Sequence, residues 1–234
     1  MEVALHERQE QIYQSQARFK VVAAGRRFGK SFLAAVTLLV EASKTHKTRS
    51  DGTEVDLLLE EVFYIGPTFD QSKRIMWPLL MEIGRDLIAH KHEQTGVLTL
   101  INGRRIQIKG SDRPDNLRGT GLSYVVLDEY AFMKASVWEL IIRPQLTRSE
   151  GGALFIGTPE GKNHFYELYN MAANEDHKYD AYEAFHFPSI DNPHLPESEI
   201  EEARDTSSAA SFAQEYEADF ETGGGTVLTP DMFP

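Results

Sequence analysis

Two short segments of the sequence carry residue types that bind phosphate and a metal ion. The first runs from Ala24 to Ser31 and reads AGRRFGKS, the glycine, lysine and serine spacing of a phosphate-binding loop. In such a loop, backbone N–H groups and the positive end of the following helix surround a triphosphate. The lysine neutralises β- and γ-phosphate oxygens, and the serine hydroxyl binds Mg²⁺. The expected nucleotide-binding residues of this loop are Ala24, Gly25, Arg26, Arg27, Phe28, Gly29, Lys30 and Ser31.

The loop departs from the consensus at its first glycine position, which holds Ala24. Because a Cβ atom disfavours left-handed backbone, we expect Gly25 to supply the flexibility there. We expect one of Arg26 and Arg27 to contact phosphate and the other a neighbouring carboxylate, and the sequence leaves open which does which. The alternative interpretation of the loop is a chance Gly-Lys-Ser at the start of a helix.

The second segment is Asp128-Glu129, which follows the apolar run from Tyr124 to Leu127. The carboxyl end of a buried parallel strand is where such sheets bind ligands. We expect Asp128 to hold the Mg²⁺ shell and Glu129 to orient or deprotonate the attacking water. Taken alone, the pair would be interpreted as a polar turn. Combined with the phosphate loop, it favours a hydrolase over a kinase.

Short apolar runs alternate with helical segments in the sequence that surrounds these two sites. The predicted strands are residues 19–24, 62–66, 123–127, 153–156 and 182–187. The predicted helices are residues 7–16, 31–42, 71–89 with a kink at Pro78, and 163–173, followed by an acidic helical tail over 197–220. Because strands that alternate with helices form parallel sheets, the pattern predicts an α/β domain.

A β-hairpin interrupts this alternation. Residues 97–101 and 104–109 flank Asn102-Gly103, which is the sequence of a type I′ turn. Residues 45–61 are expected to form a surface loop.

Composition limits the class of protein. The chain has 234 residues, 41% of them hydrophobic and 26% charged, as in an ordinary globular domain. It has no cysteine, which excludes disulfides, a cysteine nucleophile and thiolate-bound metals. The apolar runs are shorter than the roughly 20 residues of a membrane span, so no membrane association is expected. Residues 1–120 carry 18 Lys/Arg and 15 Asp/Glu (+3), and residues 121–234 carry 6 and 21 (−15). A polyanion site is therefore expected in the first half.

The sequence resembles a known family, the ATPase domain of the large terminase subunit, which is the DNA-packaging motor of tailed bacteriophages. The resemblance rests on the arginine-bearing phosphate loop, on residues 111–119 (SDRPDNLRG), on residues 124–129 (YVVLDE) and on residues 157–159 (GTP). It covers roughly residues 5–220. It implies a RecA-like P-loop NTPase fold with a mostly parallel core sheet flanked by helices, an added β-hairpin and a small C-terminal helical lid.

The resemblance also implies roles for particular residues. Gly157, Thr158 and Pro159 would couple hydrolysis to movement, although a Thr-Pro pair at the end of a strand is often only a turn. Gln9 lies where the family reads adenine. For Gln9 the alternative is a solvated helix face. Arg118 would act in trans on the ATP of a neighbouring subunit.

For Arg118 the alternative is a salt bridge to Asp112 or Asp115. The expected catalytic residues are Glu129, Lys30, Arg26 and Arg118. The candidate DNA contacts are Arg104, Arg105 and Lys109 on the hairpin, because a motor grips the DNA backbone with a few Lys and Arg side chains. Protection of an exposed strand edge is the alternative explanation of these charges.

The function implied by the resemblance is Mg²⁺-dependent ATP hydrolysis that drives double-stranded DNA into a procapsid in the host cytoplasm. The expected partners are duplex DNA, the portal protein, the small terminase subunit and further copies of the chain in a ring. Residues 1–187 would form the ATPase core, 188–220 a lid and 221–234 the start of a linker to a nuclease domain that this chain lacks. The alternatives are one domain of a helicase-type translocase and a nucleotide-bound docking module without turnover.

Overall fold

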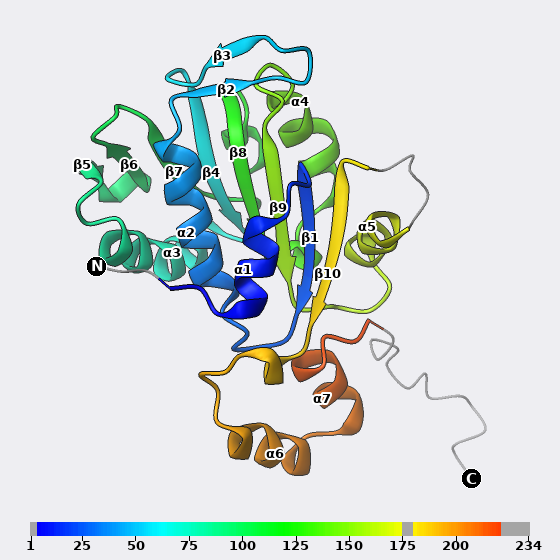
Figure 1. Cartoon of the computed structure of the whole chain (residues 1–234). Helices are drawn as coiled ribbons and strands as arrows, with labels where there is room; N and C mark the ends of the chain where they lie inside the picture. The colour runs from blue at the N-terminus through cyan, green and yellow to red at the C-terminus, as the bar shows by residue number, and fades with distance from the viewer. Residues whose placement is uncertain (1–3, 175–179, 221–234) are drawn as a thin grey trace.

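The protein is described by a computed structural model over residues 4–174 and 180–220 (Figure 1). A central sheet of eight strands has the order β10-β1-β9-β8-β4-β7-β6-β5. Six of these strands are mutually parallel: β1 (Phe19–Ala24), β4 (Glu60–Gly66), β7 (Arg105–Gly110), β8 (Gly121–Asp128), β9 (Gly152–Gly157) and β10 (Tyr182–Phe187). The other two strands, β6 (Val97–Leu100) and β5 (Ile88–His92), are antiparallel additions at one edge.

Helices cover both faces of the sheet (Figure 1). One face carries α1 (Glu7–Gln14), α2 (Lys30–Ser43) and α3 (Phe69–Ile83), and the other carries a π-helical segment (Val137–Ile142), α4 (Arg143–Gln145) and α5 (His164–Ala173). The helices α6 (Glu197–Thr206) and α7 (Ala209–Tyr216) lie beyond the carboxyl ends of β1 and β10. The mostly parallel α/β fold with its helical lid, predicted from the sequence, is confirmed.

The central strands are apolar throughout because both of their faces are buried. Successive side chains of a strand point to opposite faces, so β1 places Val22 in the cluster under α2 and Val21 in the cluster under α5. All six residues of β1 are buried. The two clusters pack on both faces of β1 and β8, and these are the strands that lead into the two polar segments.

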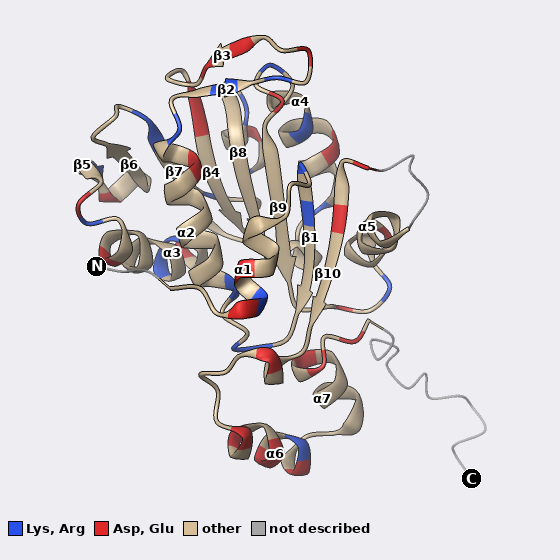
Figure 2. Cartoon of the chain, viewed as in Figure 1, with Lys and Arg blue, Asp and Glu red and all other residues tan. Residues whose placement is uncertain are grey.

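Acidic residues gather on the lid. Figure 2 shows several acidic segments along α6, which contains Glu197, Glu199, Glu201, Glu202 and Asp205 against one basic residue, Arg204. The strong negative charge of the second half of the chain is therefore partly concentrated at the lid.

The helix predicted over residues 71–89 is shorter than expected. It ends at Ile83, where the N–H of Gly84 caps the carbonyl of Leu80, and the chain then forms β5 from Ile88. The open edge of the hairpin strand β6 supplies backbone partners for this segment, so tertiary pairing overrides the local helical pattern.

The predicted surface loop over residues 45–61 is also partly wrong. It contains β2 (His46–Thr48) and β3 (Glu54–Asp56), which pair as a separate antiparallel ribbon. Its last two residues, Glu60 and Glu61, begin β4 and are buried.

The hairpin β6–β7 is present, but its turn is not type I′. That turn needs positive φ at both central residues. Gly103 has φ 86°, whereas Asn102 is not in the left-handed region. Asn102 is instead used for its side chain, which donates to the carbonyl of Ala42 and accepts from the N–H of Arg104.

Candidate nucleotide-binding site

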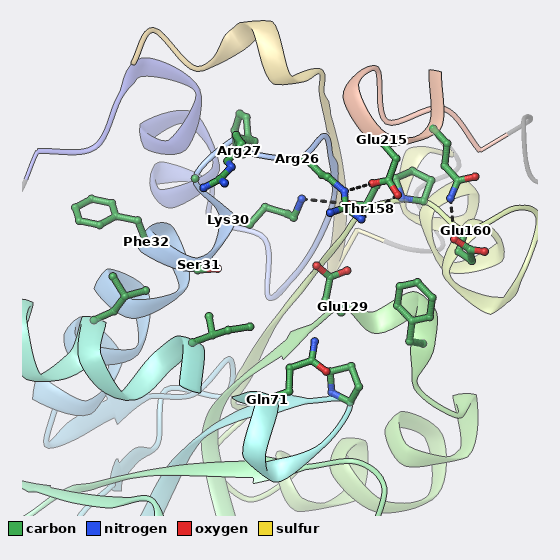
Figure 3. Close-up of a pocket in the computed structure, with 18 residues that line it drawn as sticks. Arg26, Arg27, Lys30, Ser31, Phe32, Gln71, Glu129, Thr158, Glu160 and Glu215 are labelled. Carbon is green, nitrogen blue, oxygen red and sulfur yellow. Dashed lines mark hydrogen bonds and ion pairs between the residues drawn. The ribbon is translucent and has the colours of Figure 1, made fainter. Parts of the chain in front are cut away.

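The phosphate loop joins β1 to α2 at the carboxyl edge of the sheet, and a cavity of about 990 Å³ opens beside it (Figure 3). A cavity of this size is at the upper end of the range for small-molecule sites. Its polar lining includes Arg26, Arg27, Lys30, Ser31, Gln71, Glu129, Thr158, Glu160 and Glu215. The structure therefore brings the two polar segments of the sequence together in one cavity.

Two loop residues have left-handed backbone: Arg27 with φ 62° and Gly29 with φ 99°. Gly25, which we expected to provide this freedom, has no positive φ and is a glycine for a different reason. A Cβ atom there would lie 2.6 Å from the carbonyl oxygen of Tyr216 and would also clash with Ser189. Gly25 thus allows the lid to approach the loop.

Lys30 is buried, and its ammonium group has three acceptors. It donates to the carbonyls of Ala24 (2.7 Å) and Gly25 (2.9 Å) and to Oγ1 of Thr158 (3.1 Å). Burial lowers the pKa of Lys30, and the nearby carboxylates of Glu129 and Asp128 oppose this shift. The charge of Lys30 is thus placed at the loop, and a phosphate group can replace these neutral acceptors with charged ones.

Asp128 ends β8 and is 4% exposed. One carboxylate oxygen, Oδ1, accepts from the N–H of Glu129 at 3.0 Å, and the other, Oδ2, accepts from the hydroxyl of Tyr64. Burial raises the pKa of Asp128, and the Tyr64 hydrogen bond and the Lys30 charge oppose the rise. A tyrosine on β4 is therefore part of the acidic site.

Glu129 has φ 55°, a left-handed conformation that is rare for a residue with a side chain. With this backbone conformation, the Glu129 carboxylate points into the cavity and faces Lys30 from the other wall (Figure 3). Burial and, second, the charge of Asp128 raise the pKa of Glu129, whereas Lys30 and a hydrogen bond from the Thr158 backbone lower it. Unfavourable backbone at a cavity-lining carboxylate is typical of functional sites.

The donor atoms fit a magnesium ion that arrives with a nucleotide. Among the described residues, no group of three or more His, Asp or Glu side chains could hold a metal alone. Mg²⁺ prefers oxygen ligands and keeps several waters, and it usually takes only one or two protein ligands besides phosphate oxygens. The candidate protein ligands are the Ser31 hydroxyl, which lines the cavity, and the Asp128 carboxylate at the end of β8.

The lid contacts the phosphate loop directly. The side chain of Arg26 forms an ion pair with Glu215 of α7, and the backbone N–H of Arg26 donates to the backbone carbonyl of Glu215 at 2.7 Å. The hydroxyl of Ser189 and the amide of Asn192 donate to the carbonyls of Arg26 and Arg27, both at 2.6 Å. Of the two loop arginines, Arg26 is thus the one that contacts a carboxylate.

Gln9 is 3% exposed, so the solvated-face alternative does not apply. Its amide donates to the carbonyl of Gly29 at 3.0 Å and its oxygen accepts from the N–H of His6 at 3.1 Å. The Gln9 side chain therefore links the phosphate loop to the start of α1.

Thr158 follows β9 and is buried beside the loop. Its hydroxyl joins the Lys30 ammonium, and its backbone contacts the Glu129 carboxylate. Pro159 also lines the cavity. The segment expected to couple hydrolysis to movement therefore touches both the phosphate loop and the acidic residue.

The prediction that Arg104 contacts DNA is wrong. Its side chain is fully buried and donates to the carbonyls of Glu41, Lys44 and Glu60 and to the hydroxyl of Ser123. It ties the end of α2 to the starts of β4 and β8.

The other two hairpin residues lie on the opposite face of β7 from the buried side chains Ile106 and Ile108. The Arg105 side chain is 54% exposed and ion-paired with Glu61. The Lys109 ammonium lies 5.4 Å from the centroid of the Phe63 ring.

Arg118 is at the other end of the sheet from the acidic pair. It follows a 3₁₀ turn, Pro114–Leu117, three residues before β8 begins, whereas Asp128 ends β8. The Arg118 side chain is 56% exposed, and its Nε lies 3.6 Å from the carboxylate of Asp115.

Two site residues were missed at the sequence level. Tyr64 lies on a predicted strand, but its contact with Asp128 depends on how β4 pairs with β8. Glu215 lies in the acidic tail, 189 residues from its partner Arg26. The tail's many carboxylates give no local signal that singles out Glu215.

The fold and the cavity together define the class of protein, which is a RecA-like P-loop domain. Its phosphate loop and the acidic end of β8 meet at one cavity, and the helical lid contacts the loop. The family model that describes the N-terminal part of the T4-like terminase large subunit matches residues 21–233. The chain therefore belongs to the terminase large-subunit family.

The relatives agree. The terminase large subunit of Thermus virus P23-45 is 29% identical over 96% of this chain and 50% of its own length, and that of Escherichia phage T5 is 27% identical over 90% and 46%. The chain thus spans about half the length of these curated relatives. Among solved structures, the Thermus phage P74-26 large terminase ATPase domain matches with TM-score 0.75 and 28% identity, over 93% of this chain and 94% of that one.

A more distant structure, the large terminase of a thermophilic bacteriophage in complex with ATP-γ-S, has the same fold at 17% identity and TM-score 0.69, covering 92% of this chain and 52% of that one. Within the described residues, every helix is too short or too polar to cross a membrane.

Proposed function

We propose that this chain hydrolyses ATP with Mg²⁺ and that the hydrolysis drives translocation of double-stranded viral DNA into a procapsid. The observation that carries the proposal is that Lys30 and Glu129 face one cavity from the phosphate loop and from the end of β8. A cation placed for phosphate and a carboxylate placed for water are the two groups that hydrolysis of a phosphoanhydride requires.

In the proposed mechanism the loop N–H groups and Lys30 hold the β- and γ-phosphates, which replace the carbonyl and hydroxyl acceptors that Lys30 uses here. Ser31 and Asp128 would hold Mg²⁺, which supplies charge neutralisation of the phosphate oxygens when bound. Glu129 orients the attacking water and accepts its proton.

The finer parts of the proposal follow from the same geometry. Thr158 touches both sides of the reaction centre, so a change at the phosphates moves the end of β9 and the segment beyond it. Arg105 and Lys109 are the remaining candidates for the DNA backbone. We propose the portal protein, the small terminase subunit and further copies of this chain in a ring as partners, because the family packages DNA as an assembled motor.

The test is Glu129→Gln. The variant is expected to bind a nonhydrolysable ATP analogue with Mg²⁺ as the wild type does, and to lose at least about 100-fold in the rate of phosphate release, the usual contribution of a general base. Glu160→Gln is the matched control, since Glu160 lines the same cavity but pairs with Gln214 of the lid. Equal turnover in the wild type and in Glu129→Gln would show that Glu129 does not handle the water. No turnover by wild-type rings would favour the docking-module alternative.

A further inference from the structure

Tyr64 is a buried tyrosine whose hydroxyl is committed to the acidic site. It lies in the middle of β4 and is 1% exposed. In the parallel pairing of β4 with β8, Tyr64 is opposite Val126. Because side chains alternate along a strand, Asp128, two residues beyond Val126, points to the same face as Tyr64. The strand register therefore places the phenol next to the carboxylate.

The hydroxyl of Tyr64 fixes the carboxylate of Asp128 from a second direction. The N–H of Glu129 holds Oδ1, and the Tyr64 hydroxyl donates to Oδ2. With one donor alone, the terminal torsion of an aspartate is broad. With two donors on different oxygens, the plane of the carboxylate is fixed, and the orientation of its remaining lone pairs is therefore fixed as well.

A buried tyrosine hydroxyl usually has a hydrogen-bond partner, and the partner of Tyr64 is the carboxylate of the acidic site. Elsewhere in the same apolar cluster, Tyr124 is also buried, on β8 four residues before Asp128. It lines a different cavity, at the opposite end of the sheet. The two tyrosines share their packing environment, and Tyr64 differs from Tyr124 in that its hydroxyl reaches Asp128.

We propose that Tyr64 is a positioning residue for the magnesium site, and that its hydroxyl holds Asp128 in the orientation that receives the Mg²⁺ shell of a bound nucleotide. The inference rests on the proposed role of Asp128. Tyr64 acts through Asp128 and does not itself touch the nucleotide. Groups that orient a metal ligand in this way typically change metal affinity by about 10- to 100-fold when they are removed.

The experiment measures how Mg²⁺ strengthens the binding of a nonhydrolysable ATP analogue, by calorimetry with increasing Mg²⁺ and with EDTA. In Tyr64→Phe we expect the Mg²⁺ concentration at half-maximal effect to rise about tenfold. Binding of the analogue in EDTA is expected to stay unchanged, because the ring and its packing remain. Tyr124→Phe is the matched control and should leave both quantities unchanged. Thermal unfolding of both variants tests whether the fold is intact.

Two outcomes would overturn the inference about Tyr64 alone. One is an unchanged Mg²⁺ midpoint in Tyr64→Phe while Asp128→Asn loses the Mg²⁺ effect. The other is an equal loss of affinity with Mg²⁺ and with EDTA, which would indicate a general packing role. If Asp128→Asn keeps the wild-type Mg²⁺ effect, the proposed role of Asp128 fails, and the inference fails with it.

Discussion

The guanidinium of Arg26 in the phosphate loop is ion-paired with the carboxylate of Glu215 on α7, and the backbone N–H of Arg26 donates to the carbonyl of that same residue. Bonding to Glu215 is the main cause that raises the pKa of Arg26. The Arg26 side chain is 64% exposed and lines the cavity. Glu215 of the lid thus pairs with the Arg26 guanidinium, a cation that could otherwise bind a phosphate group in the cavity.

This relationship predicts opposite effects of two substitutions. Arg26→Ala is expected to weaken binding of an ATP analogue about tenfold, the lower range for a charge-assisted hydrogen bond. Glu215→Ala is expected to keep or strengthen binding, because it frees Arg26 and breaks only an exposed ion pair. Calorimetry measures both. Glu217→Ala, which removes a carboxylate next to α7 that pairs with Arg204, is the control. Equal weakening by Arg26→Ala and Glu215→Ala would contradict the prediction.

A second prediction concerns the pH dependence of stability at Glu61. Its side chain is 4% exposed, and burial raises its pKa even though Arg105 and Lys109 pull the pKa down. A glutamate with a raised pKa binds more protons in the folded state than in the unfolded state. The free energy of unfolding therefore falls as pH rises from the ordinary glutamate pKa of about 4.3 through the raised value.

Glu61→Gln removes this titration, and the amide can still bond Gln107. We expect the free energy of unfolding of the variant, relative to wild type, to increase with pH across that interval. Urea unfolding at several pH values measures it. Glu82→Gln removes the same charge from an exposed position of α3 and serves as the control. A stability difference that does not change with pH would refute the prediction.

The hairpin supplies a third prediction. Arg105→Ala with Lys109→Ala should weaken duplex DNA binding equally for all sequences and reduce the slope of log K against log salt by about 1.8, because each lost phosphate contact removes about 0.9. Arg74→Ala with Lys91→Ala removes the same charge from exposed positions and is the control. An unchanged slope in the hairpin variant would show that Arg105 and Lys109 do not contact DNA, and would leave them the contacts seen in this structure, with Glu61 and with the Phe63 ring. Arg104 is omitted because its side chain supports the fold.

The sequence was informative where local pattern and chemistry coincide. The apolar runs that end in AGRRFGKS and in Asp128-Glu129 predicted β1 and β8, because strands buried on both faces need continuous apolar residues. It failed where a residue's partner is distant in sequence. Arg104 looks like an exposed hairpin charge, yet its acceptors come from α2, β4 and β8. β5 depends on the edge that β6 offers.

The contacts of the candidate site show the same limit. Gly25 was expected to provide backbone freedom, but the requirement for glycine there comes from the lid, which is distant in sequence. The role of Tyr64 depends on the register between β4 and β8. Pairing and register follow from packing of the whole sheet, which a single sequence does not display.

The last prediction is that Arg118 acts on the ATP of a neighbouring subunit. It precedes β8, and the eight residues of that strand span about 23 Å before Asp128 is reached. Arg118 therefore lies too far from the nucleotide cavity of its own subunit to reach a phosphate there. Its only described ion pair, with Asp115, is long and exposed, so the guanidinium is available at little cost. An arginine that enters a neighbour's site contributes on the order of 10³ to 10⁵ in rate.

The test mixes two variants under conditions that assemble the ring. Arg118→Ala keeps an intact nucleotide cavity but lacks the arginine, and Lys30→Ala keeps Arg118 but lacks the lysine of the phosphate loop. Each variant alone is therefore expected to be inactive. In mixed rings an Arg118→Ala subunit can use the arginine of a Lys30→Ala neighbour, and part of the ATPase activity should return. Arg113→Ala, an exposed arginine five residues earlier, should be active alone. If mixed rings are demonstrated by mass spectrometry and show no recovery, Arg118 does not act in trans, and its contact with Asp115 is then its structural role.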